Sequence, residues 1–385
     1  MGPGEDFGSV HEGVLPERIG SEWGTLAAGQ AERLPSLAFK LPDGRAWRYE
    51  VRDGSIALSE SGEAETVVEL AESDWQGLWT AREAVNGLVL SGRVKLAEGK
   101  VEDFLGWECA LRVLYEQLRP YDPAAPLLGR GGVEIDPTRS FYPDDEPEEM
   151  ADFLRVTGYV VVREVFSRAE VSVFTQAADV ARRSAREDDG RSWWSEDVAG
   201  GRHLVRVLDG GKDPGLNALP ADPRLRSIVS LSDFDLEPSA NEGVSVLYKR
   251  AGMVFDGKAD QPWHRDCGIG GHSLMCPVMN GSVFLRRADE GSGELRFLPG
   301  SWRTAGASID FHDWRLGVGI QAAPGDFALH YGDGLHAGTP PAADSGPFRW
   351  SVVFEYGRIG RGPEQTQEHY DALMLDRDAR SLHSS

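Results

Sequence analysis

Two histidines, one aspartate and one arginine constrain the fold of this chain more than any other feature of its sequence. His264 and Asp266 stand two residues apart, whereas His336 and Arg349 follow much later. Residues i and i+2 of an extended segment project from the same side of the backbone, so His264 and Asp266 can bind one metal ion together. A third ligand, His336, must then come from a distant strand. The pattern therefore predicts a β-structure that brings remote strands together around a metal.

The residue types predict which metal this is. Two imidazoles and one carboxylate hold non-haem Fe(II) on one face and leave three positions open for a cosubstrate and O₂. Arg349 supplies a planar bidentate donor for the distal carboxylate of a 2-oxo diacid, because a carboxylate inside an apolar barrel needs a charged partner. Ser351, facing the same way, is expected to be a second donor. A structural salt bridge is the alternative role for Arg349.

Four phrases around these residues occur in an order that resembles the phytanoyl-CoA dioxygenase family of Fe(II)/2-oxoglutarate oxygenases. They are TGYVVV at 157–162, PWHRD at 262–266, GELRFLPGS at 293–301 and PGD at 324–326. The resemblance covers about residues 146–358. One position departs from it, since Trp302 stands where relatives often have histidine, and this puts the shape of the substrate pocket in question.

This resemblance implies a fold and a cofactor. The fold is a double-stranded β-helix, also called a jelly roll or cupin-like barrel, with Fe(II) as cofactor and 2-oxoglutarate and O₂ as cosubstrates. The residues that it implies for the metal are His264, Asp266 and His336. Arg349 and Ser351 are expected to bind 2-oxoglutarate. Tyr248 and Lys249, on a strand before the metal motif, are expected to contact its other end.

The resemblance also implies a reaction, which is hydroxylation of an unactivated C–H bond or further oxidation such as desaturation or ring formation. Family members that halogenate carry a small residue at the position of Asp266. We therefore do not expect halogenation.

Four other histidines compete with these ligands in principle: His203, His272, His312 and His330. His272 lies in a glycine-rich loop and His312 lies beside Asp313, so both are expected outside the ligand set. His330 is the main rival to His336. We favour His336 because it falls in the position of the family's distal ligand. A ligand at 330 would also place Arg349 19 residues away, which is long for the return to the next strand.

Short strands separated by Gly and Pro turns recur from residue 244 to residue 356, as expected for a mainly β domain with flanking helices. The clearest strands are expected at 282–285, 293–298, 326–330 and 350–356. Ser167 and Glu170 fit a capping box that begins a helix over about 168–183. We place this catalytic domain at 146–360, followed by a polar tail at 361–385.

Residues 1–120 are predicted to form a separate small α+β domain. A hairpin turns at Asp53-Gly54, a third strand follows at 66–70, a helix begins near 73, extended chain returns at 87–92, and a last helix carries Phe104 to Leu118. This order, with LSGRVKL at 90–96, is similar to the sterol-carrier-protein-2 (SCP2) family. Pro and Gly residues indicate a linker at 121–145.

The role of this SCP2-like domain stays open at the level of sequence. Its apolar stripe is explained by an ordinary core, or by a tunnel of the kind that relatives use for acyl chains or sterols. The domain then presents a hydrophobic substrate, lines one wall of the pocket, or mediates the formation of a homodimer.

The composition excludes several classes of partner. With 385 residues and a net charge of −22, the chain lacks the excess of Lys and Arg that binding to nucleic acid requires. Cys109, Cys267 and Cys276 match neither a disulfide framework nor a zinc motif, which favours reduced thiols and a cytoplasmic location. No apolar run approaches the roughly 20 residues of a membrane span.

Together these patterns predict an Fe(II)/2-oxoglutarate-dependent dioxygenase that acts on a hydrophobic small molecule. Candidate substrates are a fatty-acyl thioester, a terpenoid or sterol, and a polycyclic or polyketide-type intermediate of secondary metabolism. One alternative is a lipid-binding or scaffold protein whose barrel has lost catalysis. Another is a cupin-like metalloenzyme that does not use 2-oxoglutarate and so needs no carboxylate partner such as Arg349.

Overall fold

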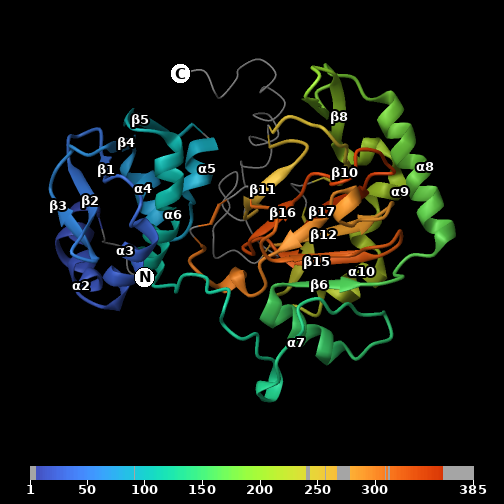
Figure 1. The fold of residues 1–385 in the computed structure, drawn as a ribbon, viewed down its shortest axis with the longest axis horizontal. Coiled ribbons are helices and arrows are strands. Elements are labelled where there is room, and N and C mark those ends of the chain that lie inside the picture. Colours follow the sequence, from blue (N-terminus) through green and yellow to red (C-terminus); the bar gives the residue numbers. More distant parts are fainter. Residues whose placement is uncertain are drawn as a thin grey trace.

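Two structural units follow each other along the chain, an N-terminal α+β unit and a larger unit built on two β-sheets (Figure 1). The computed structural model describes residues 6–90, 92–239, 243–255, 257–266, 278–307, 309–310 and 313–358. Among these residues, no helix is both long enough and apolar enough to cross a membrane.

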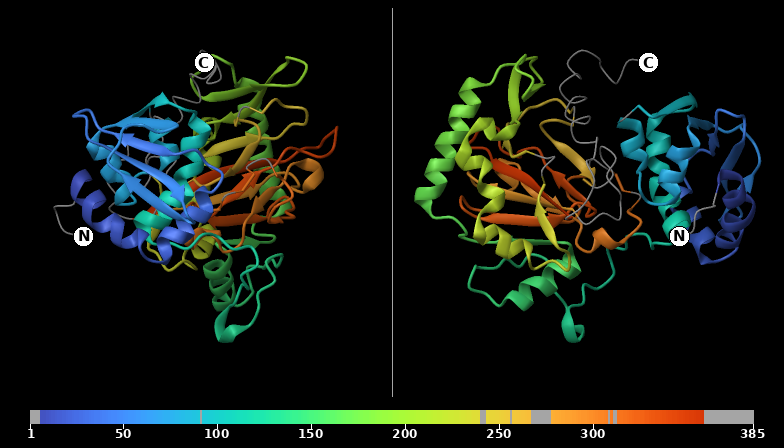
Figure 2. Two further views of the ribbon diagram at one scale, coloured as in Figure 1. Left: turned by 60° about the vertical axis from the view of Figure 1, so that its left-hand side comes forward. Right: turned by 180° about the vertical axis from the view of Figure 1, so that it is seen from behind.

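The N-terminal unit packs helices against one sheet, whose described strands have the order β3-β2-β1-β4-β5. These strands are β1 (Leu37–Lys40), β2 (Ala46–Arg52), β3 (Ser55–Ser59), β4 (Thr66–Leu70) and β5 (Val94–Glu98). The helical segments are α1 (Phe7–Ser9), η1 (Val10–Val14), α2 (Leu15–Ile19), α3 (Glu22–Ala31), α4 (Glu72–Trp79), α5 (Val85–Leu90) and α6 (Val101–Glu116). Strands β1 and β4 are parallel, and the other named pairs are antiparallel. Helix α6 lies on the side that faces the second unit (Figures 1 and 2).

Most of the predicted elements of this unit are present, and one is wrong. The predicted hairpin is β2 and β3, the third strand is β4, and the last helix is α6. The extended chain predicted at 87–92 is instead helix α5 over most of its length. Val85 and Leu88 are both buried and stand at helical spacing, and a short apolar run does not distinguish strand from helix by periodicity.

Aromatic side chains fill the centre of the N-terminal unit. Phe7, Trp75 and Trp107 are at most 1% exposed and belong to one continuous hydrophobic cluster. Trp75 contacts Phe7 edge-on at a ring separation of 4.9 Å. The apolar stripe of the sequence therefore forms a packed core. A relation of this unit to the SCP2 family stays a prediction.

The second unit consists of two antiparallel sheets, so the prediction of a mainly β unit with flanking helices is confirmed. The larger sheet has the order β6-β15-β12-β17-β10-β8-β7, with β9 pairing with β17. Its strands are β6 (Tyr159–Val162), β7 (Ser192–Glu196), β8 (Arg202–Val207), β9 (Leu236–Pro238), β10 (Ser245–Tyr248), β12 (Met279–Phe284), β15 (Phe327–Tyr331) and β17 (Trp350–Arg358). The smaller sheet has the order β11-β16-β13-β14, formed by β11 (Gln261–His264), β16 (His336–Gly338), β13 (Leu295–Phe297) and β14 (Val318–Gly319).

Helices cover the larger sheet from outside (Figure 1). They are α7 (Pro147–Thr157), α8 (Arg168–Ser184), α9 (Pro214–Asn217) and α10 (Pro223–Val229), with short 3₁₀ turns η2 (Arg130–Gly132), η3 (Asp209–Lys212), η4 (Leu219–Ala221), η5 (Glu290–Ser292) and η6 (Ser301–Arg303). Helix α8 begins at the predicted capping box, in which the Ser167 and Glu170 side chains each accept from the other residue's backbone N–H. Val171 and Ala178 of α8 pack into the core of the unit.

Candidate metal centre and its pocket

The smaller sheet brings the predicted metal ligands together. His264 ends β11 and His336 begins β16, and these two residues are paired across the two strands. Asp266 follows β11, and its backbone N–H donates to the Gly332 carbonyl at 2.8 Å. One potential ligand atom from each of His264, Asp266 and His336 lies within 4.8 Å of the others. The three residues therefore form a compact cluster of two imidazoles and one carboxylate.

Backbone carbonyls orient both imidazoles. Nδ1 of His264 lies 2.7 Å from the Pro262 carbonyl oxygen, and Nδ1 of His336 lies 3.0 Å from that of Gly334. A proton on each Nδ1 satisfies these contacts and leaves Nε2 facing Asp266, at 3.4 Å for His264 and 3.3 Å for His336. This is the arrangement that metal-binding histidines require. The hydrogen bond made by one ring nitrogen determines that the other ring nitrogen is free to bind the metal.

The protonation states of the cluster also suit a cation. Burial lowers the pKa of His336 to about 3, so this imidazole is neutral and its Nε2 lone pair is available. Burial alone would raise the pKa of Asp266, but the neighbouring histidines outweigh it and hold the pKa well below its usual value. Burial also opposes a charge on His264, yet Asp266 raises the pKa of this group. The carboxylate thus attracts positive charge, which a metal ion can supply.

His330 and Asn280 contact the same carboxylate from the larger sheet. They are paired across β15 and β12, and both the Asn280 Nδ2 and the His330 Nε2 reach Oδ2 of Asp266, the latter at 3.3 Å. His330 does not belong to the compact cluster, although its ring centroid lies 4.4 Å from that of His336. Its Nδ1 is buried and has no hydrogen-bond partner among the described residues. His330, the alternative ligand considered from the sequence, thus lies beside the cluster.

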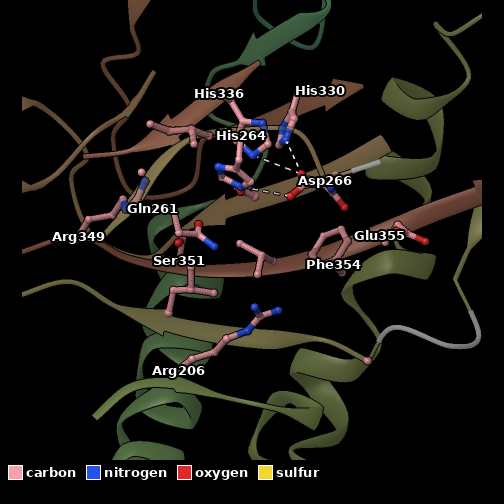
Figure 3. Close-up of a pocket in the computed structure, with 17 residues that line it drawn as sticks. Arg206, Gln261, His264, Asp266, His330, His336, Arg349, Ser351, Phe354 and Glu355 are labelled. Atoms are coloured by element: carbon pink, nitrogen blue, oxygen red, sulfur yellow. Dashed lines mark hydrogen bonds and ion pairs between the residues drawn. The ribbon is translucent and has the colours of Figure 1, made fainter. Parts of the chain in front are cut away.

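Arg349 and Ser351 line the same pocket as the cluster (Figure 3). Arg349 is 5% exposed, and among the described residues its Nε has no hydrogen-bond partner. Burial lowers the pKa of this guanidinium to about 10, which still leaves it charged at neutral pH. A buried cation with an unused donor is costly unless an anion pairs with it. The site therefore fits the carboxylate of a bound ligand.

Tyr248 and Lys249 do not line this pocket, and their expected contact with the cosubstrate finds no support in their positions. On β10 it is Leu247 that faces the pocket, and the Tyr248 hydroxyl donates to the Ala178 carbonyl on α8 at 2.7 Å. Side chains alternate along a strand, so adjacent residues point to opposite faces.

The Lys249 ammonium is buried and donates to the carbonyl oxygens of Ala259 and Gly338 and to the Asp260 carboxylate, at 2.6–2.7 Å. Burial lowers the pKa of Lys249 to about 8, helped by nearby Arg349 and opposed by Asp260. Its donors are therefore occupied by protein atoms, and it supports the β16 backbone next to the cluster.

The pocket lies between the two sheets and also contains residues that the sequence analysis did not select. Figure 3 shows Gln261 near Arg349. It shows Phe354 and Glu355 on the Asp266 side of the pocket, and Arg206 facing the cluster from β8. Arg206 stacks on the Trp193 ring at 4.4 Å, and among the described residues its buried Nε lacks a hydrogen-bond partner. Strand alternation would have missed Gln261, because residues three apart on a regular strand point to opposite faces; a register irregularity of β11 between Gln261 and His264 accompanies the placement of both in the pocket.

Trp302, the departure from the family pattern, lies away from the pocket. It stacks on Tyr331 at 4.0 Å, and its indole N–H donates to the Arg155 carbonyl at 3.1 Å. Among the remaining histidines, His203 pairs with Asp197 at 2.7 Å. The expectations for His272, His312, Cys267 and Cys276 concern positions outside the described residues.

Fold and site together define a mainly β protein with a His–Asp–His cluster in a pocket between two sheets. Residues 154–345 match the phytanoyl-CoA dioxygenase (PhyH) family, so the chain carries a domain of this family. Iron and 2-oxoglutarate are the cofactor and cosubstrate that this family domain and the cluster indicate. A comparison with curated proteins gives no match.

Several solved structures are similar to this chain over a little more than half its length. EvdMO1 has 22% sequence identity and a TM-score of 0.43 over 55% of this chain, and the match spans only 50% of EvdMO1. AviO1 from Streptomyces viridochromogenes Tue57 has 20% identity and a TM-score of 0.41, covering 57% of this chain and 98% of AviO1. SnoN, a non-heme alpha ketoglutarate dependent epimerase from nogalamycin biosynthesis, has 20% identity and a TM-score of 0.44, covering 58% of this chain and 88% of SnoN.

Proposed function

We propose that this protein is an Fe(II)/2-oxoglutarate-dependent oxygenase that hydroxylates, or further oxidises, an unactivated C–H bond of a hydrophobic small molecule. The observation that carries the proposal is the presence, in one pocket, of the His264, Asp266 and His336 cluster and of the buried Arg349, whose Nε has no hydrogen-bond partner among the described residues. A cupin-like metalloenzyme without 2-oxoglutarate has no use for a buried arginine at this place. A degenerate binding protein has no use for the intact cluster.

His264, Asp266 and His336 are proposed to hold the iron, each through the atom that faces the centre of the cluster. Iron held there would supply the redox chemistry by which O₂ oxidises 2-oxoglutarate to succinate and CO₂ and its second oxygen atom enters the substrate C–H bond as a hydroxyl group. Because Asp266 fills the third ligand position with a carboxylate, hydroxylation is proposed rather than halogenation. Asn280 and His330 are proposed to fix the orientation of that carboxylate.

Arg349 is proposed to bind the distal carboxylate of 2-oxoglutarate, with Ser351 as a second donor. The Arg349 backbone carbonyl accepts from the Lys249 N–H at 2.9 Å, and Lys249 also supports Gly338 beside it. The Arg349 backbone is thus fixed by its neighbouring strand, and the side chain that it carries is buried. A donor held in this way loses little conformational entropy on binding.

The rest of the pocket supports a substrate that is mostly apolar with some polar groups. The apolar lining comes from Leu247, Leu295, Val353 and Phe354, and Arg206 is available for hydrogen bonds. A lipid, a terpenoid or a polyketide-type secondary metabolite fits this description.

Iron-dependent conversion of 2-oxoglutarate tests the proposal without knowledge of the substrate. Purified protein with Fe(II), 2-oxoglutarate, ascorbate and air is expected to form succinate slowly, and faster when a screened hydrophobic compound is its substrate. His264→Ala should abolish succinate formation, whereas the matched control His203→Ala, which removes a side chain 2.7 Å from Asp197, should keep it. If succinate formation is independent of iron or survives in His264→Ala, the proposed function is wrong.

A further inference from the structure

A buried ion-pair network connects the N-terminal unit to the two chain segments that carry the proposed metal ligands. Its central residue is Asp333, three residues before His336. Arg265, which stands between His264 and Asp266, pairs with it. Arg265 is 8% exposed, and its guanidinium donates to Asp333 at 3.3 Å and to the Thr304 carbonyl at 3.1 Å. The two ligand segments are thus tied by side chains as well as by the backbone bond from Asp266 to Gly332.

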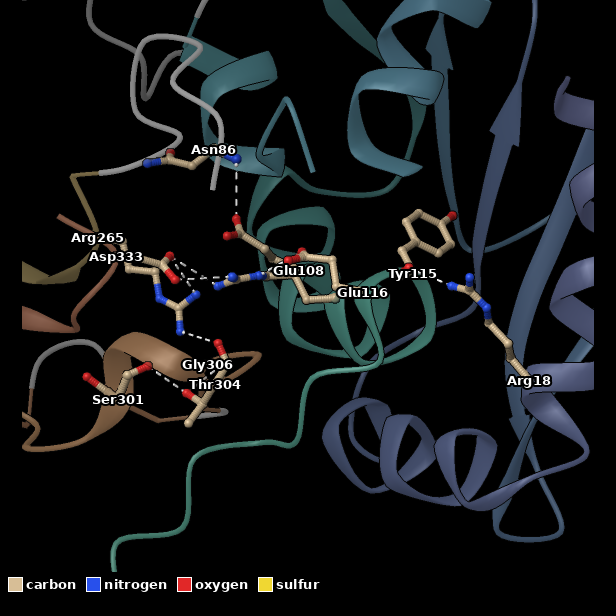
Figure 4. A network of polar contacts seen from close by, with 11 residues as sticks. Arg18, Asn86, Glu108, Tyr115, Glu116, Arg265, Ser301, Thr304, Gly306 and Asp333 are labelled. Carbon is tan, nitrogen blue, oxygen red and sulfur yellow. Dashed lines mark hydrogen bonds and ion pairs between the residues drawn. The ribbon is translucent and has the colours of Figure 1, made fainter. Parts of the chain in front are cut away.

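The third member of the network comes from the other unit. Arg112 of α6 is 3% exposed, and its two terminal nitrogens lie 3.5 and 3.4 Å from the two carboxylate oxygens of Asp333. Its Nε donates to Glu116 at 3.0 Å. Figure 4 shows Arg265 and Asp333 facing the part of α6 that carries Glu108 and Glu116. Asp333 therefore stands between two arginines, one from each unit.

The chain around this network is also packed against the N-terminal unit. Ala305 belongs to the hydrophobic core of that unit, although it lies in the second unit by sequence. Its backbone N–H donates to the Arg119 carbonyl at 2.8 Å, and the Tyr121 N–H donates to the Gly306 carbonyl at the same distance. The segment from Thr304 to Gly306, which also receives the Arg265 side chain, is thus fixed from the side of α6.

We propose that the N-terminal unit completes the metal centre, with Arg112 as a positioning residue that acts through Asp333 and Arg265 on the segments of His264, Asp266 and His336. This inference rests on the proposed function of that cluster. A buried ion pair contributes little net stability, but it fixes which groups lie opposite each other. Here the groups that it fixes are the neighbours of all three proposed ligands. A contact that only joined the two units would not need to lie next to the segments that carry the proposed metal ligands.

Metal binding by the full chain tests the inference with a readout that does not depend on turnover. Co(II) is the probe, because its visible absorption reports the coordination geometry. Arg112→Met is expected to weaken Co(II) binding about tenfold and to alter the Co(II) spectrum, at the low end of the loss found when groups around metal ligands are removed. Arg112→Lys, which keeps the charge, is expected to recover part of the affinity.

Arg18→Met is the matched control. Arg18 donates to the Leu114 and Tyr115 carbonyls at the end of the same helix, away from the cluster, so this change perturbs α6 without touching Asp333. Its Co(II) affinity should stay within twofold of the wild type. Asp333→Asn provides a second test if Arg112→Met does not fold, and the same tenfold loss is expected.

The outcomes separate the inference from the proposed function. Wild-type affinity and spectrum in Arg112→Met, or in Asp333→Asn where only that variant folds, would overturn the inference alone. An equal loss in Arg112→Met and Arg18→Met would overturn it as well, because general weakening of the N-terminal unit would then explain the effect. A wild-type protein that binds no Co(II) would overturn the proposed metal centre and this inference together.

Discussion

Replacing Arg349 with methionine should separate ligand binding from stability. The side chain is 5% exposed, and its Nε has no hydrogen-bond partner among the described residues. Truncating one partner of a buried, hydrogen-bonded charge pair costs about 2–5 kcal/mol of binding free energy. Taking about 3 kcal/mol, the dissociation constant of 2-oxoglutarate should rise roughly 150-fold. The fold should not suffer, because methionine has a similar length, and the two acidic groups that act on the Arg349 charge, Asp260 and Glu294, keep their ion pairs with Lys249 and Arg296.

Calorimetry of the anaerobic Mn(II)-loaded protein measures this dissociation constant directly. Arg206→Met is the matched control, since Arg206 lines the same pocket and also has a buried Nε without a partner among the described residues. Its dissociation constant for 2-oxoglutarate should stay within threefold of the wild type. A value for Arg349→Met within threefold of the wild type would refute the role proposed for this residue. A large loss in Arg206→Met instead would transfer the role to the other arginine.

Two further predictions concern the fold. Burial lowers the pKa of His11 to about 4, whereas the unfolded chain has an ordinary value near 6.5. Between these two pH values the unfolded state binds more protons than the folded state. The stability therefore falls as the pH falls from 6.5 to 4. The free energy of unfolding of the N-terminal unit should drop by about 2 kcal/mol from pH 7 to pH 5 on account of His11. Urea titrations of His11→Gln should show a smaller drop over the same pH range. An equal drop in this variant would contradict the prediction. Trp302→Ala should lower the free energy of unfolding by about 3–5 kcal/mol, because it empties a packed site between α7 and Tyr331. At temperatures where the variant is folded it should bind 2-oxoglutarate like the wild type, and a tenfold loss would show that Trp302 shapes the pocket after all.

Much of the second unit was predictable because its strands carry local signals. The strand expected at 326–330 is β15, the strand expected at 350–356 is β17, and helix α8 begins at its capping box. Such patterns depend on neighbours in sequence. Helix α5 was missed because the signal is equally local there: its three consecutive apolar residues, 88–90, suit a strand as well as a helix.

Parts of the site were not predictable in this way. The sequence placed Tyr248 on a strand near the metal motif but did not say which face that strand presents, and a shift of one residue reverses the answer. The contact of Arg112 with Asp333 joins residues 221 positions apart, and neither carries a motif. The ligand spacing was more informative, because the i and i+2 rule applies within one strand end.

The most direct test of the proposed site is an anaerobic titration with Fe(II) and 2-oxoglutarate, following the weak visible absorption band that appears when both bind at one centre. The wild type and His330→Ala should show the band, and His336→Ala should lose it. A band that is absent from the wild type would contradict the proposed oxygenase. A band that survives in His336→Ala and disappears in His330→Ala would show that the ligand set is wrong.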